Sequence, residues 1–156
     1  MGAARDASTA IVWPPVIFAA AMLGAGVLTW WLPWHLPPAH GVMTIAGGLV
    51  ISAALTLFIG AGREFSRAAT AILPNQPTSA IVAAGVYRVS RNPMYLGQVL
   101  FLLGLALLTG SAWFLIAAPF AMLAYRQLAI LREEAYLERK FGLVYLAYKA
   151  RVRRWL

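Results

Sequence analysis

Two long stretches of the sequence lack charged side chains, and their lengths fit helices that cross a membrane. The first stretch covers residues 7–62 and the second covers 92–125. A helix rises 1.5 Å per residue, so about 20 apolar residues cross a hydrocarbon core about 30 Å thick. The first stretch is therefore long enough for two spans, which we place at 11–32 and 41–62. The proline-rich segment 33–38 separates them.

The second stretch predicts a helical hairpin. It is too long for one span and short for two, and Gly110-Ser111 marks its middle. We therefore expect one helix over 93–109 and a second over 112–131. The second helix contains Pro119, which is expected to kink it because proline removes a backbone hydrogen bond.

Composition supports a single membrane domain. The 156 residues are 62% hydrophobic and 12% charged, and none is cysteine. Disordered chains combine high charge with low hydrophobicity. The composition therefore excludes an intrinsically disordered protein. The lack of cysteine excludes a disulfide framework, a thiolate metal site and a cysteine nucleophile. We predict one all-α integral membrane domain over 1–156 with four spanning helices, or five if the linker 63–92 re-enters the membrane.

A cleaved signal peptide is the competing interpretation of the opening residues. Such a peptide has a positively charged start followed by an uninterrupted apolar run. Here only Arg5 is positive ahead of the apolar run, and Pro14-Pro15 interrupts it. The sequence therefore favours a spanning helix at this position.

The basic residues are distributed unevenly along the chain. The sequence has 13 Lys+Arg against 5 Asp+Glu, a formal net charge of +8. The loops 33–40 and 110–111 contain no Lys or Arg, whereas 63–92 and 132–156 contain most of them. The positive-inside rule then predicts that both termini and the segment 63–92 are cytoplasmic, and we expect a bacterial inner membrane. Attraction to membrane lipids accounts for the charge, so no nucleic-acid partner is expected.

Residues 132–156 predict an amphipathic helix at the cytoplasmic interface. Apolar or aromatic side chains recur there every three or four residues, at Leu137, Phe141, Tyr145, Tyr148, Val152 and Trp155. That spacing forms one apolar face, and the basic residues on its flank suit a helix lying in the membrane surface.

The start of the third predicted span is a candidate anion-binding site. Asn92 is a favoured N-cap residue, and Pro93 is tolerated in the first turn of a helix. Unpaired N–H groups there, with Arg88 and Arg91 beside them, would hold a carboxylate or a phosphate. The alternative is an ordinary capped span whose arginines extend to the interface.

Glu133 and Glu134 are adjacent at the predicted membrane boundary. Neighbouring positions do not face each other on a helix, so the two carboxylates do not form a catalytic pair on one face. We expect one to point into the bundle and the other to pair outward, for instance with Arg126 or Arg132. The inward carboxylate needs a cation, which is either an arginine or a positively charged cofactor.

These motifs resemble those of a family of membrane enzymes. The run Arg91-Asn-Pro-Met-Tyr-Leu-Gly97 is similar to the Arg-(His/Asn)-Pro-x-Tyr-x-Gly signature of the isoprenylcysteine carboxyl methyltransferases. The related phospholipid methyltransferases share the paired glutamates. The family's C-terminal signature resembles Arg132-Glu-Glu and the run Leu137, Phe141, Gly142, Tyr145, Tyr148 and Val152. Upstream, the positions that fit its pattern are Thr70, Pro74, Pro77, Gly85, Tyr87 and Arg88. The resemblance covers about residues 66–156.

The resemblance implies an integral membrane methyltransferase that uses S-adenosylmethionine and needs no metal. The positions it assigns to the reaction are Arg91, Asn92, Glu133 and Glu134. Cofactor contacts are expected from Gly85, Tyr87, Arg88, Arg91, Asn92, Pro93, Tyr95, Gly97, Glu133, Glu134, Tyr145 and Tyr148. Arginine suits the cofactor's carboxylate, the glutamates suit its ammonium or ribose hydroxyls, and tyrosine suits adenine or the sulfonium. Each tyrosine is alternatively a residue of the interfacial aromatic belt.

The acceptor is expected to be lipophilic and to reach the site from the bilayer. An isoprenylcysteine-like carboxylate, a phospholipid and a small lipophilic molecule all remain open. Gln98 and Arg126 are polar groups at membrane depth, where such residues usually face the bundle interior, and we assign them to the acceptor. Asn92 stands where many family members have His, which removes a titratable base from the motif.

Two other classes of function compete with the methyltransferase. A reductase-like member of the same membrane superfamily would use a nicotinamide cofactor, but such relatives are longer. A small transporter or scaffold would normally carry a charged residue within a span, and the first three predicted spans have none.

Overall fold

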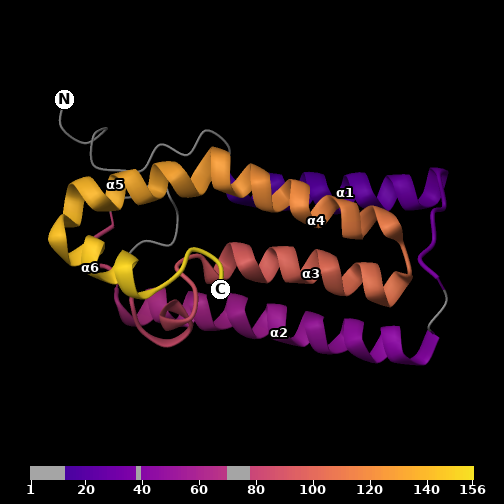
Figure 1. Cartoon of the computed structure of the whole chain (residues 1–156), viewed down its shortest axis with the longest axis horizontal. Helices are drawn as coiled ribbons and strands as arrows, with labels where there is room; N and C mark the ends of the chain where they lie inside the picture. The colour runs from indigo at the N-terminus through magenta and orange to yellow at the C-terminus, as the bar shows by residue number, and fades with distance from the viewer. Residues whose placement is uncertain (1–12, 38–39, 70–77) are drawn as a thin grey trace.

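Four long helices lie side by side with alternating direction in the computed structural model (Figure 1). The structure describes residues 13–37, 40–69 and 78–156. The four helices are α1 (Pro14–Trp31), α2 (His40–Arg67), α3 (Pro93–Thr109) and α4 (Ala112–Tyr125). In the described ranges the only strand-like pairing is an isolated bridge between His35 and Ser111. The predicted all-α class is therefore confirmed.

The length and surface of these helices identify a membrane protein. In the part of the chain that the structure describes, three helical stretches are long and apolar enough to cross a membrane: Pro14–Trp31, Gly41–Arg67 and Ala112–Phe141. The apolar α3 is shorter, with 17 residues. Large apolar side chains that face outward include Leu23, Val27, Val42, Ile45, Leu49, Phe58, Leu115 and Phe120. Such a surface is stable in lipid and unusual for a soluble monomer.

Glycines bring α2 and α3 into close contact. A Cβ atom placed on Gly47 would lie 2.9 Å from the Gly104 carbonyl oxygen, and one on Gly97 would lie 2.9 Å from the Ala54 carbonyl oxygen. Small residues commonly permit such close approach of membrane helices. α3 also packs on α4, and α4 packs on α1, so that α1 and α2 lie at the two sides of the hairpin.

The two turns at one end of the bundle, 32–37 and 110–111, hold each other by hydrogen bonds. The Leu36 N–H donates to the Gly110 carbonyl at 2.7 Å, and the Ala112 N–H donates to the Trp34 carbonyl at 2.9 Å. Ser111 caps α4 by accepting from the Trp113 N–H. We call this the loop end, and the opposite end, where α3 begins, the polar end.

α4 continues into the polar end without a break. It passes through a π-helical turn, η3 (Arg126–Ile130), into α5 (Leu131–Phe141), as Figure 1 shows. A π turn holds one more residue than an α-helical turn and therefore changes which side chains of the following helix face inward. Pro119 lies inside α4 with its ring exposed.

The C-terminal segment differs from the single amphipathic helix that the sequence predicts over 132–156. Gly142 has φ 53° and ψ −127°, which ends α5 and starts a second helix, α6 (Leu143–Arg151). Residues 152–156 then leave the helix and return to the start of α3. The prediction of one continuous helix was wrong because Gly142 adopts a conformation that residues with a Cβ rarely adopt.

The linker between α2 and α3 contains a short 3-10 helix, η2 (Gly85–Arg88), just before the motif at 91–97. The positions Thr70, Pro74 and Pro77, which carry part of the family resemblance, lie outside the described residues, as do the first two residues of the predicted span 11–32.

Candidate functional site

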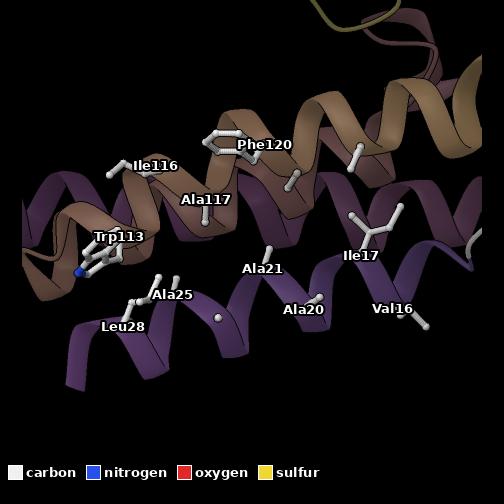
Figure 2. Close-up of a pocket in the computed structure, with 13 residues that line it drawn as sticks. Val16, Ile17, Ala20, Ala21, Ala25, Leu28, Trp113, Ile116, Ala117 and Phe120 are labelled. Atoms are coloured by element: carbon white, nitrogen blue, oxygen red, sulfur yellow. The ribbon is translucent and has the colours of Figure 1, made fainter. Parts of the chain in front are cut away.

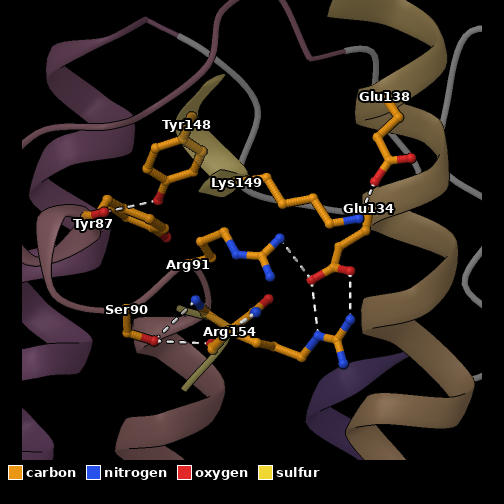
Figure 3. A network of polar contacts seen from close by, with 9 residues as sticks. Tyr87, Ser90, Arg91, Glu134, Glu138, Tyr148, Lys149 and Arg154 are labelled. Carbon is orange, nitrogen blue, oxygen red and sulfur yellow. Dashed lines mark hydrogen bonds and ion pairs between the residues drawn. The ribbon is translucent and has the colours of Figure 1, made fainter. Parts of the chain in front are cut away.

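The polar end brings together the two motifs that the sequence separates by about 40 residues. Five segments meet there: η2, the first turn of α3, α5, α6 and the extended residues 152–156. Figure 3 shows side chains from η2, from the residues just before α3, from α5 and α6 and from the C-terminal segment gathered around Arg91 and Glu134. Both residues are candidates from the sequence, and the fold places them in contact.

Glu134 is the centre of a buried ion-pair network. Arg154 holds its carboxylate with two hydrogen bonds, Nε to Oε1 at 2.9 Å and Nη2 to Oε2 at 2.8 Å. Nη1 of Arg91 lies 3.1 Å from the same Oε1. The Glu134 side chain is only 5% exposed. Because buried charges need paired partners, the two arginines make the burial of this carboxylate possible.

The expected partners of the glutamate pair were wrong. Within the described residues, neither Arg126 nor Arg132 forms an ion pair with either glutamate, and the Arg132 side chain is exposed. The chain instead turns back after α6 and brings Arg154 to Glu134. The hydrogen bond with Glu134 raises the pKa of Arg154 above its ordinary value.

Two nitrogens of the Arg91 guanidinium, Nε and Nη1, have no hydrogen-bond partner among the described residues. The Arg91 side chain is 8% exposed. Its Nη1 is close to Glu134 but not aligned for a hydrogen bond. Buried N–H groups without a partner are unusual in native structures and mark places where a ligand or water completes the site.

Glu133 lies on a different side of α5 and has a different environment. Its Oε2 accepts a hydrogen bond from the Tyr95 hydroxyl at 3.3 Å, and within the described residues it has no ion pair. The Tyr95 ring stacks on Tyr125 with centroids 4.9 Å apart. The Tyr125 hydroxyl in turn donates to the Gln98 side-chain oxygen at 2.5 Å. A half-buried carboxylate without a cation thus borders an aromatic stack.

Asn92 occupies the N-cap position of α3, but its side chain does not cap the helix. Its Nδ2 donates to the Arg154 carbonyl at 3.1 Å, and the Ser90 hydroxyl donates to the same oxygen at 3.2 Å. The Arg91 N–H donates to the Arg153 carbonyl at 3.0 Å. Residues 152–156 therefore cover the beginning of α3, which the sequence predicted as an open anion site.

Three buried tyrosines line the side of the site formed by η2 and α6. The Tyr148 hydroxyl donates to the Tyr87 carbonyl at 2.8 Å, which ties the two elements together (Figure 3). The rings of Tyr145 and Tyr148 lie 6.1 Å apart. Burial, with a contribution from the nearby Glu134 carboxylate, raises the pKa of Tyr145 to about 12. This phenol is therefore a hydrogen-bond donor at neutral pH.

The other predicted site residues lie around this centre. Gly97 packs against the α2 backbone, and Gly85 has φ 55° with the Glu64 side chain against it. Pro93 is buried at the start of α3, whereas the Arg88 side chain is exposed. Arg126 is half-buried in the π-helical turn.

The sequence interpretation missed Arg154, Ser90 and Tyr125 as site residues. Arg154 is one of seven basic residues after position 131, and nothing in the local pattern separates it from its neighbours. Tyr125 is the last residue before the charged segment, so its spacing to Gln98 and Tyr95 depends on the hairpin geometry.

The match to a known protein family covers α2 to α5, but neither most of α6 nor residues 152–156, which contain Arg154. A family model described as phospholipid methyltransferase matches residues 38–143. The curated proteins include a relative from Haemophilus influenzae, described as an uncharacterized protein. It is 44% identical over 63 residues, which cover 40% of this chain and 100% of the relative. No solved structure matches the chain.

Proposed function

The chain belongs to the phospholipid methyltransferase family, and we propose that it transfers a methyl group from S-adenosylmethionine to a lipophilic acceptor. The family and the apolar helices identify a membrane methyltransferase in general terms. The methyl donor, the acceptor class and the roles of individual residues are the proposal. The proposal rests on one observation. Arg91 and Glu133 lie at the same end of the bundle, and within the described residues Arg91 has N–H groups without an acceptor and Glu133 has no ion-pair partner. Together they can bind a ligand that has both a negative and a positive group.

The residues at the polar end fit S-adenosylmethionine. Arg91, whose buried Nε lacks a partner among the described residues, would hold the carboxylate of the donor. Glu133, which within the same ranges has one hydroxyl donor and no cation beside it, would hold the ammonium or the ribose hydroxyls. Tyr145, protonated at neutral pH, would offer a hydrogen bond or an aromatic face. Bound there, S-adenosylmethionine supplies a methyl group that its sulfonium has already activated.

The remaining task of the protein is to bring the acceptor to this methyl group and to keep water out. Effective molarities of well-oriented reactants reach about 10⁵ M or more, so positioning alone can account for much of the rate. The stacked rings of Tyr95 and Tyr125 form an apolar wall beside Glu133. An amine acceptor would lose its proton to Glu133 or to water, whereas a carboxylate acceptor needs no base.

Gln98 and Arg126 would contact the acceptor rather than the donor. Gln98 accepts from the Tyr125 hydroxyl and leaves its amide NH₂ group available. Arg126 is a half-buried cation in the π-helical turn and would attract an anionic head group. We propose that the polar end faces the cytoplasm of a bacterial inner membrane, in agreement with the positive-inside rule.

Isothermal titration of the purified protein with S-adenosylhomocysteine tests the proposal. We expect saturable binding that Glu133→Gln weakens at least about tenfold, a loss of about 1.4 kcal/mol. Glu138→Gln is the matched control, because Glu138 lies on the same helix but pairs with Lys149. A chain that ignores S-adenosylhomocysteine but binds NADPH would be a reductase, and one that binds neither would contradict any role for either cofactor.

A further inference from the structure

The last residues of the chain cover the side chains to which the donor is assigned. Arg91 is 8% exposed and Glu134 is 5% exposed. The Arg153 carbonyl accepts from the Arg91 N–H at 3.0 Å, and the Arg154 guanidinium holds Glu134. We call residues 143–156, which comprise α6 and the extended segment after it, the C-terminal lid. Because Nε of Arg91 is buried, a ligand can reach it only when an element that covers it moves.

Few buried side chains hold the C-terminal lid in place. Of its 14 residues, all of which the structure describes, only Tyr145 and Tyr148 are buried. By contrast, α3 has eight buried residues among its 17. The outward side of α6 includes exposed Leu143, Val144 and Leu146. Segments with few buried contacts open at a low free energy while the rest of a protein stays folded, so the lid is the part of the polar end expected to open.

Gly142 lies where the lid joins α5. Its φ of 53° and ψ of −127° end α5 and start α6, and a Cβ atom at this position would meet nothing within 4 Å. Hinges are usually a few residues at the ends of elements that absorb a change of φ and ψ, and glycine absorbs such a change most easily because it has no Cβ. The backbone at Gly142 can therefore act as the hinge of the lid.

An ion pair between Lys149 of α6 and Glu138 of α5 fastens the lid to the rest of the polar end (Figure 3). We call this pair the latch. The two side chains are 36% and 34% exposed, and ion pairs that water reaches are weak. Neither residue is assigned to the donor. The Tyr148 hydroxyl adds a hydrogen bond to the Tyr87 carbonyl at 2.8 Å.

An apolar groove between α1 and α4 is a less suitable entrance for the donor. Figure 2 shows the side chains of the two helices facing each other across it. Its volume is about 490 Å³, and none of the 13 residues that line it is charged. S-adenosylmethionine carries charged groups, and burying an unpaired charge among apolar side chains is costly. A charged donor is therefore expected to enter at the polar end.

We propose that the C-terminal lid opens about Gly142 to admit and release the methyl donor and closes over it during transfer. The inference rests on the proposed function, because it concerns access to that donor site. Closure of the lid places Tyr145 and Arg154 at the site and keeps water out. The latch forms whether or not the donor is bound, so it sets the rates of entry and exit and leaves the dissociation constant unchanged.

Release of radiolabelled S-adenosylhomocysteine tests the latch. Glu138→Gln and Lys149→Met should each raise the dissociation rate constant about threefold in a chase with unlabelled compound, because a weak ion pair is lost. The dissociation constant, measured by titration, should stay the same, so that the association rate constant rises by the same factor. Arg139→Gln removes an exposed charge next to the latch and is the control, with both rates unchanged.

A crosslink across the latch should have the opposite effect. The chain has no cysteine, so the double variant Glu138→Cys, Lys149→Cys carries the only two thiols. After loading with S-adenosylhomocysteine, a short bis-maleimide that joins them should slow release at least about tenfold. The same variant treated with N-ethylmaleimide, which blocks both thiols without joining them, is the matched control.

Hydrogen exchange measures the opening without a donor. In the ligand-free protein, amides of 143–151 should exchange at least about tenfold faster than those of 99–106 in α3, and the bis-maleimide should slow them. Equal release from the crosslinked and the N-ethylmaleimide-treated protein would overturn the inference, and so would protection of 143–151 as strong as that of α3. Fast exchange that the crosslink slows, in a protein that fails to bind S-adenosylhomocysteine, would support the opening of the lid and contradict the proposed function, so the two failures are distinguishable.

Discussion

Arg154 and Glu134, 20 residues apart in the sequence, form a two-point contact that joins the C-terminal segment to α5 (Figure 3). Arg91 shares the same carboxylate, so the start of α3 is part of the same network. The backbone of residues 153 and 154 adds hydrogen bonds to Arg91, Ser90 and Asn92. The motif at 91–97 and the glutamate pair thus depend on a third segment, residues 152–156, to hold them in place.

Arg154→Ala should loosen the polar end without removing a direct contact to the donor. It deletes two charge-assisted hydrogen bonds, each worth roughly 1.5–3 kcal/mol when buried, although the 26% exposure of the Arg154 side chain reduces this value. We expect a lower melting temperature by nanoscale fluorimetry and weaker binding of S-adenosylhomocysteine. Arg153→Ala is the control, because its side chain is exposed. Equal effects of the two variants would contradict a specific role for Arg154.

The two adjacent glutamates should respond differently to the same substitution. Glu134→Gln leaves two arginines with a neutral partner in a buried network, which should destabilise the fold by about 3 kcal/mol. Glu133→Gln removes a carboxylate that has no ion pair in the described structure, so stability should change little while donor binding is lost. Unfolding curves and S-adenosylhomocysteine titrations of both variants, measured side by side, test this difference. A Glu134→Gln variant that is stable but does not bind S-adenosylhomocysteine would show that Glu134, and not Glu133, holds the donor.

The close contact of α2 and α3 predicts that the same substitution has different effects on stability at Gly47 and Gly48. Gly47→Ala should cost about 1–3 kcal/mol, because its new methyl group would meet the α3 backbone at 2.9 Å. Gly48→Ala should be neutral or slightly stabilising, since nothing lies within 4 Å and alanine favours helix more than glycine does. Unfolding in mixed detergent measures both. Similar losses for the two variants would indicate that helix flexibility, and not the helix contact, is responsible.

The break between α5 and α6 should depend on Gly142. Alanine at φ 53° and ψ −127° stores about 1–3 kcal/mol of backbone strain. We expect Gly142→Ala to displace α6, and with it Tyr145 and Tyr148, and so to weaken S-adenosylhomocysteine binding as well as stability. Gly62→Ala, in a helix and with open space around it, serves as the control. Unchanged binding in Gly142→Ala would show that α6 does not shape the donor site.

The sequence predicts the helices well where the chain carries local signals. Pro93 starts α3, and Gly110 with φ 66° ends it, because proline favours the first turn and glycine the left-handed position after the last. Gly142 is equally visible, but a lone glycine inside an amphipathic pattern is often tolerated, so its break could not be told from a continuous helix. The π-helical turn at Arg126–Ile130 has no comparable signal in its residues.

The candidate site was predictable only in part, for a reason that lies in tertiary structure. Arg91 and the glutamate pair stand out because they adjoin helix starts or the membrane boundary. Which cation meets Glu134 depends on the path of the chain after Gly142, and that path follows from long-range packing. The same holds for Tyr125, which reaches Tyr95 only because α3 and α4 are paired along their length.

The π-helical turn determines the direction in which each side chain of α5 points. Successive residues of a helix differ by about 100°, so an unbroken α-helix through the same residues 126–130 would advance every later residue by one position. Glu133 would then take the angular place of Glu134 opposite the arginines, and Arg132 would take the place of Glu133 beside Tyr95. The extra residue of the π turn therefore keeps a carboxylate, and not an arginine, beside the aromatic stack.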